Sequence, residues 1–398
     1  MGNANAMPAQ TSVVTASSQA GKRRTRLPAG AARAYSMVAA LALLWLIFAI
    51  VTNGIFLEAR NFSNLIRQAA VTGIVSVGMV MVIIAGEIDL SVGSLVGLTG
   101  MATALVEYYW HWSLVSSLLA AILIGLMVGA LQGGLTSYGK IPSFIVTLGG
   151  LLVWRGMTKG ISNGRTYPIE LPSFRALGQA YLGRTTGLLL LAVALAVVIW
   201  SVIHRNSLRK RHGLQPWNLA AISFRIIGPS ALAIGFVLAL NSYAGIPVPV
   251  LIFVVVALAG AFVTENTLFG RYLYAIGGNP EAARFSGINL RAQVLVAFCL
   301  LGFLTAIAGV IYTARLGSAG PDAGTLLELD AIAACVIGGA SLAGGRGTVL
   351  GACLGALFMV SLDNGMSLKN VPDFVQDIIK GGILVTAVGL DVIGKRRE

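Results

Sequence analysis

The stretch Ala85-Gly-Glu-Ile-Asp-Leu-Ser-Val-Gly-Ser94 places two carboxylates and two hydroxyls between charge-free apolar runs at 68–86 and 90–106. A membrane-spanning helix needs about 20 apolar residues, and a charged side chain at membrane depth is costly unless it has a partner or water. The simplest structure for this stretch is two membrane helices separated by a polar break. We expect Asp89 or Ser91 to cap the second helix, because free amide groups at a helix start favour a side-chain oxygen and a negative charge.

The composition of the whole chain agrees with a membrane protein. Its 398 residues have a mean hydropathy of +0.83, and 56% are hydrophobic while only 11% are charged. Soluble globular chains carry about a quarter charged residues. The net charge of +13 does not indicate nucleic-acid binding, because the basic residues stand in short clusters beside apolar runs, as they do in membrane proteins. We predict no nucleic-acid partner and contact with membrane lipid.

Outside the opening stretch, further charge-free runs bring the total to twelve apolar segments. The run at 226–264 is broken by Asn241-Ser-Tyr-Ala-Gly-Ile-Pro-Val-Pro249 and counts as two segments joined by a tight turn. The segments at 141–154 and 381–390 are too short to span, so they must borrow flanking polar residues, tilt, or enter and leave from one side. The prediction is an all-α, polytopic integral membrane protein of about ten to twelve helices. The other runs are 34–57, 108–139, 185–204, 292–314, 331–345 and 347–362.

Basic residues in the connections predict the orientation. Clusters stand at 22–33, 204–212, 271–291 and 395–397, with an even number of apolar segments between each pair. Because cytoplasmic loops are rich in Lys and Arg, both termini are expected in the cytoplasm. We expect residues 1–34 to be a disordered basic tail and 35–394 to be the membrane domain. This domain includes a helix pair at about 185–241, which the family resemblance given below marks as an extra pair, and a cytoplasmic loop at about 266–291.

Three collinear matches indicate an internal duplication. They pair Glu87–Gly97 with Glu328–Gly338, Gly125–Leu131 with Gly351–Leu357, and Ile141–Ile145 with Val371–Val375. The implied halves span about 60–170 and 300–393. Repeated halves with broken or short helices around a pathway are typical of transporters.

The carboxylates of both halves admit three roles. They are expected to cap discontinuous helices, with Glu328 and Asp330 acting before 331–345 as Asp89 does in the first half. Alternatively they line the solute path, or they couple transport to protons or ions, as in a secondary transporter. The candidates for a broken helix or for the translocation path are Glu87, Asp89, Ser91, Glu328 and Asp330.

Asn279-Pro280-Glu281 has the pattern of a helix start within the cytoplasmic loop. Asn is a good N-cap, Pro fits the first position and Glu complements the helix dipole. Gly287 is expected to end this helix after at most two turns. Such a short, exposed helix suits a docking element, although an ordinary amphipathic loop is the alternative.

The sequence predicts neither a catalytic residue nor a cofactor in this chain. Cys299, Cys335 and Cys353 lie in apolar segments without CxxC spacing or neighbouring histidines, which disfavours a metal site. The stretch Gly345–Gly351 lacks the lysine of a nucleotide-binding loop.

Three stretches together resemble the signatures of the ribose/xylose-type sugar ABC importer permeases. They are Gly86-Glu-Ile-Asp-Leu-Ser-Val-Gly-Ser94, Ala275-Ile-Gly-Gly-Asn-Pro-Glu-Ala-Ala-Arg-Phe-Ser-Gly-Ile-Asn289 and Glu328-Leu-Asp-Ala-Ile-Ala-Ala-Cys-Val-Ile-Gly-Gly-Ala-Ser-Leu-Ala-Gly-Gly345. The similarity covers about 40–394. Within the family, the helix pair around 185–241 and Ser361-Leu-Asp-Asn-Gly-Met366 resemble the members that carry D-xylose.

The resemblance implies a permease in the bacterial inner membrane that works with a second permease copy, a cytoplasmic ABC ATPase carrying ATP and Mg²⁺, and a periplasmic sugar-binding protein. It also implies that the helix capped by Asn279 is the ATPase-coupling helix, with Glu281, Ala282, Ala283 and Gly287 as its members. The expected function is ATP-driven import of a pentose, D-xylose, by alternating access. The alternative is a proton- or sodium-coupled secondary transporter that uses the intramembrane carboxylates.

Overall fold

The computed structural model describes residues 29–395, which form α-helices joined by short connections and two small ribbons. The helices and strands are α1 (Ala29–Val51), the 3-10 turn η1 (Ile55–Leu57), α2 (Ala59–Ile84), α3 (Val92–Trp110), α4 (Leu114–Ser137), α5 (Ser143–Ser162), β1 (Tyr167–Pro168), α6 (Pro172–Gln179), β2 (Tyr181–Leu182), α7 (Arg184–Arg211), α8 (Leu219–Asn241), β3 (Ile246–Pro247), α9 (Val248–Asn266), α10 (Leu268–Gly278), α11 (Pro280–Phe285), α12 (Leu290–Leu316), β4 (Ser318–Ala319), α13 (Leu327–Ile337), α14 (Val349–Leu368) and α15 (Asp373–Lys395).

Each of the twelve predicted apolar segments corresponds to one α-helix, with shifted bounds, which confirms the all-α polytopic class. Seven helices of the described part are long and apolar enough to cross a membrane. The short runs at 141–154 and 381–390 become α5 and α15 by including flanking polar residues such as Lys159 and Lys380. In contrast, α13 has 11 residues and reaches only about 16 Å, so it is a short helix within the bundle.

The predicted tail boundary is only partly covered by the structure. The helix α1 already begins at Ala29, inside the segment assigned to the tail, and residues 1–28 lie outside the described residues.

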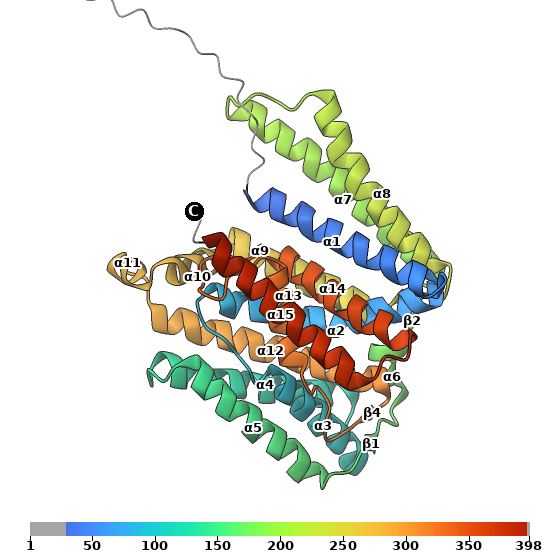
Figure 1. Ribbon diagram of the computed structural model, residues 1–398, viewed down its shortest axis with the longest axis vertical. Coiled ribbons are helices and arrows are strands. Elements are labelled where there is room, and N and C mark those ends of the chain that lie inside the picture. The colour runs from blue at the N-terminus through green and yellow to red at the C-terminus, as the bar shows by residue number, and fades with distance from the viewer. Residues whose placement is uncertain (1–28, 396–398) are drawn as a thin grey trace, which may run out of the picture.

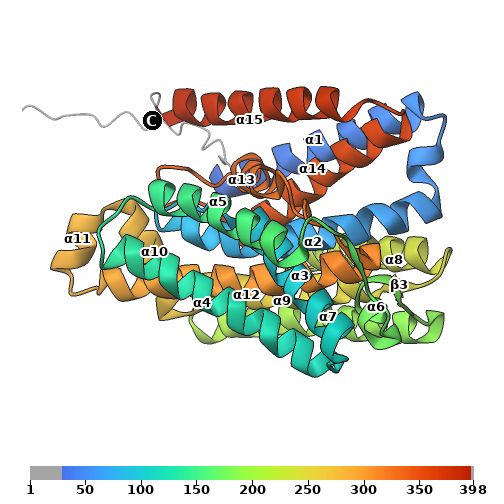
Figure 2. The ribbon, with the colours of Figure 1, turned by 90° about the horizontal axis from the view of Figure 1, so that it is seen from below.

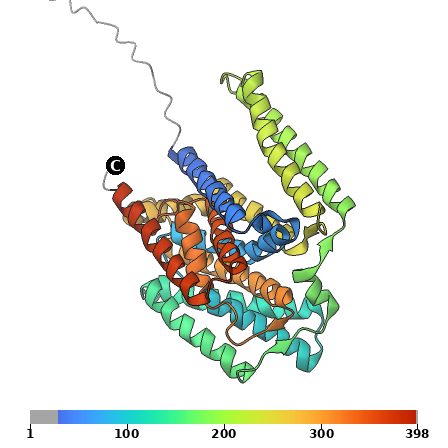
Figure 3. The ribbon, with the colours of Figure 1, turned by 45° about the vertical axis from the view of Figure 1, so that its right-hand side comes forward.

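The core is built around α2 and α12, which pack against each other near the middle of the molecule (Figure 1). In an apolar 18-residue stretch of each helix, 89% of the residues of α2 and 67% of those of α12 are buried. The corresponding shares in α7 and α8 are only 17% and 6%. α12 packs against α2, α3 and α4, while α2 also contacts α9, α13 and α14. The outer helices therefore present their apolar side chains to lipid, as α7 and α8 do where they project from the bundle (Figure 3).

Glycines bring the backbones of α4 and α12 into direct contact. A Cβ atom at Gly125 would overlap the carbonyl oxygen of Gly302, and one at Gly129 would overlap that of Phe298. Small residues at helix interfaces replace hydrophobic attraction as the main source of association inside a membrane. The two glycines, four residues apart, lie on the same face of α4 and allow this face to pack closely against α12.

The stretch Ser361–Met366 of α14 fastens the first two helices. Trp45 Nε1 of α1 donates to Ser361 Oγ at 2.9 Å, and the amides of Asn61 and Asn364 exchange hydrogen bonds of 2.9 and 3.1 Å. Gly365 lies directly beneath the ring of Phe48. Figure 2 shows α1 lying along α14.

The two ribbons lie at one end of the bundle and the basic connections at the other. β1 pairs with β4 and β2 with β3, both antiparallel, at the right in Figure 1. The start of α1, the α7–α8 connection, the α10–α11 element and the end of α15 lie toward the left and top of the same view. The elements that carry the basic clusters thus share one end, which fits the even number of crossings predicted between them.

Two of the three repeat matches occupy equivalent places. The glycine pairs fall in α4 and α14, and Pro142 and Pro372 each immediately precede the helix that follows, α5 and α15. The first match does not: Glu87 and Asp89 precede α3, whereas Glu328 and Asp330 lie inside the first turn of α13. Sequence matching aligned residue types there but not helix starts.

We predict that Gly129→Leu lowers the free energy of unfolding by roughly 1–3 kcal/mol, because the new side chain has no room against α12. Gly134→Leu is the matched control, since nothing lies within 4 Å of its Cβ position on the same helix. Both changes replace a helical glycine by leucine, so the gain in helix propensity cancels. Thermal unfolding of the purified protein measures the difference, and equal stabilities would contradict close α4–α12 packing.

Candidate functional site

The short helix α11 forms as the sequence predicts. The Asn279 side chain caps it by accepting from the Ala282 amide at 2.9 Å, and Pro280 is its first residue. The helix ends where Gly287 adopts φ +82°, a conformation that favours glycine, and the Ile288 amide donates to the Ala283 carbonyl at 3.1 Å. Both predicted boundaries of this helix are therefore confirmed.

α11 stands at the tip of the end that carries the basic connections (Figures 1 and 2). Glu281, Ala282 and Gly287 are exposed, whereas Ala283 faces inward and is buried. Phe285 is 89% exposed. An aromatic side chain held in the open by a capped helix is the kind of anchor that protein interfaces use.

Three glycine-containing segments meet beneath α11, and we call Gly86, Gly277 and Gly345 the glycine junction. A Cβ atom at Gly277 of α10 would overlap the Ile84 carbonyl oxygen and the Gly345 amide. The Gly345 amide donates to that same carbonyl at 2.9 Å. Backbone contact without intervening side chains thus joins α10 to the end of α2, where the polar break begins, and to the α13–α14 connection.

Tyr274 adds a side-chain contact to this junction. Its phenol donates to the Gly347 carbonyl at 2.7 Å, which ties α10 to the α13–α14 connection a second time. Burial, and secondarily the charge of Glu265, raises the pKa of Tyr274, so the phenol stays protonated and remains a donor.

A cavity of about 830 Å³ lies between α11 and the polar break. Glu87 lines it together with Arg284, Arg291 and Asn289. Glu87 therefore lines a cavity that it shares with the connecting segments around α11.

Asp89 belongs to a separate, buried network. Its Oδ1 accepts from the amide and the hydroxyl of Ser91 at 2.6 and 2.7 Å. In the amide orientation that satisfies its neighbours, Gln132 of α4 donates to Asp89 Oδ2 at 3.2 Å and accepts from Trp154 Nε1 of α5 at 3.1 Å. The network therefore connects the polar break to α4 and α5.

The polar break also holds the start of α5. The Ile88 amide donates to Ser143 Oγ at 3.2 Å, and the Thr147 hydroxyl lies 3.3 Å from the Ile88 carbonyl oxygen. Every polar group of an irregular segment at membrane depth needs such partners.

The predicted capping roles were wrong. α3 begins with Ser91 as its N-cap, but no side chain caps it, because the Asp89 carboxylate turns back to the Ser91 amide instead of the first helical amides. α13 begins at Leu327 with Leu326 as its N-cap, so Glu328 and Asp330 lie within the helix and cannot cap it from outside.

Glu328 packs across the helices instead. Its carboxyl lies against Gly93 in the first turn of α3, where a side chain would overlap Glu328 Oε2. Glu328 is buried, and Oε2 has no hydrogen-bond partner among the described residues. The positive end of the α3 dipole offers a favourable place for this carboxyl.

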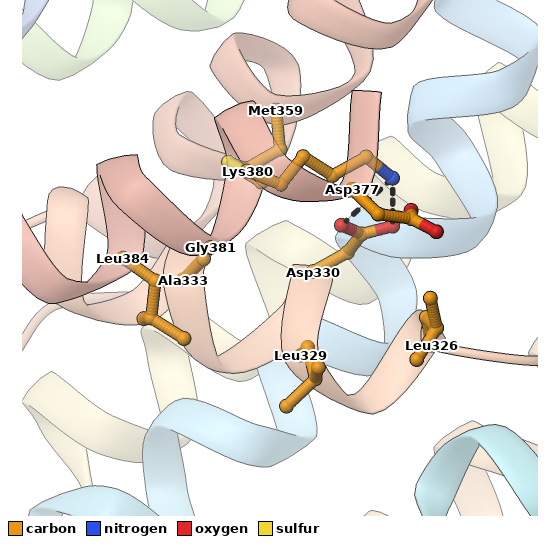
Figure 4. A pocket seen from close by; sticks show the side chains of 9 residues that line it. All are labelled: Leu326, Leu329, Asp330, Ala333, Met359, Asp377, Lys380, Gly381 and Leu384. Carbon is orange, nitrogen blue, oxygen red and sulfur yellow. Dashed lines mark hydrogen bonds and ion pairs between the residues drawn. The ribbon is translucent and has the colours of Figure 1, made fainter. Parts of the chain in front are cut away.

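Asp330 points to the other side, into a cavity of about 240 Å³ between α13, α14 and α15 (Figure 4). Lys380 of α15 lies 3.4 Å from Asp330 Oδ1 and 3.1 Å from Asp363 Oδ1. Asp377 and apolar side chains, including Met359, complete the lining. The five sequence candidates thus have different partners, and among them only Asp89 and Ser91 are joined by hydrogen bonds.

Sequence reasoning missed several polar residues around the candidates, among them Lys380, Asp363, Gln132 and Arg155. Lys380 and Asp363 stand at or near the ends of apolar runs, and their charge beside such a run was the available signal. Gln132 and Arg155, whose guanidinium donates to the Ala323 carbonyl at 2.6 Å, carried no signal in the sequence. In the described range no group of three or more His, Cys, Asp or Glu side chains is placed to hold a metal ion.

A bundle of apolar helices, with broken segments, buried polar networks and a rigidly mounted end helix, has the construction of a transport subunit. Residues 61–208 and 176–388 match the family described as branched-chain amino acid transport system / permease component. The chain is 46% identical over 364 residues to the xylose transport system permease protein of Haemophilus influenzae, covering 91% of this chain and 97% of the relative.

Two further relatives agree. The xylose transport system permease protein of Escherichia coli is 45% identical, with 92% of this chain and 93% of the relative covered. The ribose import permease protein of Escherichia coli is 35% identical over 356 residues, with 89% and 92% covered. No solved structure matches the chain. The chain belongs to this permease family and, within it, to the sugar permeases of ABC transporters, which are multi-pass inner-membrane proteins.

We predict that Lys380→Gln lowers the free energy of unfolding by roughly 1–3 kcal/mol, between the effects at exposed and at buried ion pairs. The change leaves two carboxylates without a counter-charge at a partly buried site, where the Lys380 side chain is 19% exposed. Adding Asp330→Asn and Asp363→Asn should recover part of the loss.

Lys159→Gln provides the control, because the Lys159–Asp322 pair is short, at 2.9 Å, but its side chains are 53% and 72% exposed. It should change stability by less than about 1 kcal/mol. Thermal unfolding checks both variants. A Lys380 variant as stable as the Lys159 variant would show that the α15 ion pairs do not hold the helix.

Proposed function

We propose that this chain passes a pentose, D-xylose, across the inner membrane by alternating access, as the permease of an ATP-driven importer. The observation that carries the proposal is α11, a capped, exposed helix that directly follows α10, and α10 makes backbone contacts with the end of α2 and with the α13–α14 connection. The similarity to the two xylose permeases, each more than 90% covered by this chain, supports the choice of sugar.

ATP and Mg²⁺ belong in this proposal to a separate cytoplasmic ABC ATPase, and α11 inserts into it. Phe285 supplies an apolar anchor, and Glu281 and Arg284 supply charges of opposite sign on the same short helix. Both termini lie in the cytoplasm with α11, since the elements at that end carry the basic clusters. A periplasmic sugar-binding protein then docks at the opposite end, near the two ribbons.

The glycine junction transmits movement of α11 into the membrane. A shift of α10 displaces the end of α2 and the α13–α14 connection directly, because these contacts are between backbones with no side chain in between. The first leads into the polar break with Glu87 and Asp89, and the second adjoins α13 with Glu328 and Asp330. The polar break in the first half and the α13–α14 connection in the second half thus respond to the same displacement of α10.

The sugar path runs beside the cavity of Asp330 and Lys380. Their side chains are 16% and 19% exposed, on a face where α15 otherwise shows apolar side chains such as Phe374 and Ile378. Charged groups on such a face call for water, solute or a protein partner. A second copy of the chain would enclose this face and leave carboxylates for the sugar hydroxyls to bind.

The first test exchanges charges on α11. Replacing Glu281-Ala282 by Lys-Asp, or Gly287 by Val, should abolish capture of a P-loop ATPase from solubilised native membranes, because the first alters the docking charges and the second strains the φ +82° turn. Glu170→Gln, which makes the same net change of +1 near the opposite end, is the control and should leave capture intact. ATPase capture by the α11 variants would refute the docking role.

The second test separates docking from transmission. Gly277→Ala should reduce ATP-driven uptake at least about tenfold while the ATPase still binds, because the added methyl group forces the junction apart. Gly278→Ala, whose Cβ meets nothing within 4 Å, should transport normally. Normal uptake by the Gly277 variant would exclude the junction as the transmission path.

The secondary-transporter alternative gains no support from the family and is open to a direct check. Uptake in cells that persists after the proton gradient is collapsed, and stops on ATP depletion, fits the importer. The reverse pattern would transfer the role of Asp89 and Glu328 to ion coupling.

A further inference from the structure

The α7–α8 hairpin leaves the bundle at its connecting end. Near the other end of α8, Val237 and Leu240 are buried against the apolar cluster that contains Leu65 and Ile66. Toward the connection the side chains open out, with Leu219 81% and Phe224 74% exposed. Figures 1 and 3 show this end projecting away from the other helices, so lipid and not protein surrounds it in a single copy of the chain.

The connection carries strong positive charge. Five basic residues lie between 204 and 225, and the chain has no Asp or Glu from 171 to 264. The basic residues are Arg205, Arg209, Lys210, Arg211 and Arg225. A cluster of this kind at the end of a membrane helix attracts the anionic lipids of the cytoplasmic leaflet.

Two of these arginines are held in a defined arrangement around Trp217. The Trp217 amide donates to Asn206 Oδ1 at 2.8 Å, which folds the connection back onto α7. Arg209 and Arg225 lie 5.6 and 4.0 Å from the centroid of the Trp217 ring, and Arg209 Nε also donates to the Gln215 carbonyl at 3.1 Å. In the described part of the chain neither guanidinium has a carboxylate partner.

Two guanidinium groups beside one indole repel each other, and an anion that contacts both would offset this repulsion. Cation–π contact offsets part of this repulsion and leaves the edges of both groups available. The N–H groups at those edges can donate two parallel hydrogen bonds to a pair of phosphate oxygens. Trp217 is of a residue type that is enriched at the membrane–water interface.

We propose that Arg209, Trp217 and Arg225 form a clamp for the phosphodiester of an anionic phospholipid at the cytoplasmic face of the membrane. The bound lipid supplies the missing counter-charge and anchors the end of a hairpin that the core does not hold. A free phosphate ion has the same chemistry, but the apolar surroundings of the hairpin favour the lipid.

Native mass spectrometry of the purified full-length protein, titrated with phosphatidylglycerol or phosphatidylcholine, tests the clamp. The unaltered chain should prefer the first phosphatidylglycerol over phosphatidylcholine, and Arg209→Gln/Arg225→Gln should weaken that binding about tenfold. Arg205→Gln/Lys210→Gln removes the same charge from the same connection without touching Trp217, and should weaken binding much less.

Equal losses in the two double variants would overturn the proposal, because they indicate diffuse attraction and not a site. Displacement of the lipid by an equal concentration of inorganic phosphate would also overturn it, in favour of a free-anion site. So would loss of ATPase capture in the clamp variant alone, which would make the connection a protein contact.

If the glutamine variant does not fold, Arg209→Lys/Arg225→Lys keeps the charge and removes the planar fork. It should still bind phosphatidylglycerol less tightly than the unaltered chain. Unchanged affinity in this lysine variant would reject the clamp geometry.

Discussion

Helices inside a bilayer gain little from hydrophobic attraction to one another, because lipid tails are as apolar as leucine, so their association depends on how closely the backbones approach. In this permease glycines allow such close approaches between α4 and α12 at Gly125 and Gly302, and between the end of α13 and α14 at Gly338 and Gly351. The same kind of contact joins α10 to the end of α2 and to the α13–α14 connection at the glycine junction. Packing and coupling therefore rest on one kind of contact.

Polar groups at membrane depth impose the second constraint, since each needs a partner where water is scarce. The chain meets this requirement with small local networks. Asp89 is held by Ser91 and Gln132, and Lys380 balances Asp330 and Asp363. The first network fixes a break between helices and the second fastens α15, which has few other attachments. The Glu328 carboxyl, with one oxygen unpaired and its face against Gly93, is the least satisfied of these groups.

Close backbone contacts and pinned polar breaks suit a protein that must move as rigid parts. Side chains would absorb a small displacement by changing rotamer, whereas abutting backbones pass it on. The peripheral α7–α8 hairpin differs, because its apolar surface faces outward and only its lower end joins the core. Its basic connection belongs to the membrane surface more than to the moving core.

The sequence by itself determined the features that depend on local physics. Long charge-free runs gave the twelve apolar helices, Asn279, Pro280 and Gly287 gave α11, and the three quoted stretches gave the family. Only the tertiary structure decided where the carboxylates go. Glu87, Asp89, Glu328 and Asp330 look alike along the chain, but they face a cavity with arginines, a buried amide, a helix end and a lysine. Their partners come from helices far away in sequence, and hydropathy and capping patterns carry no information about such pairings.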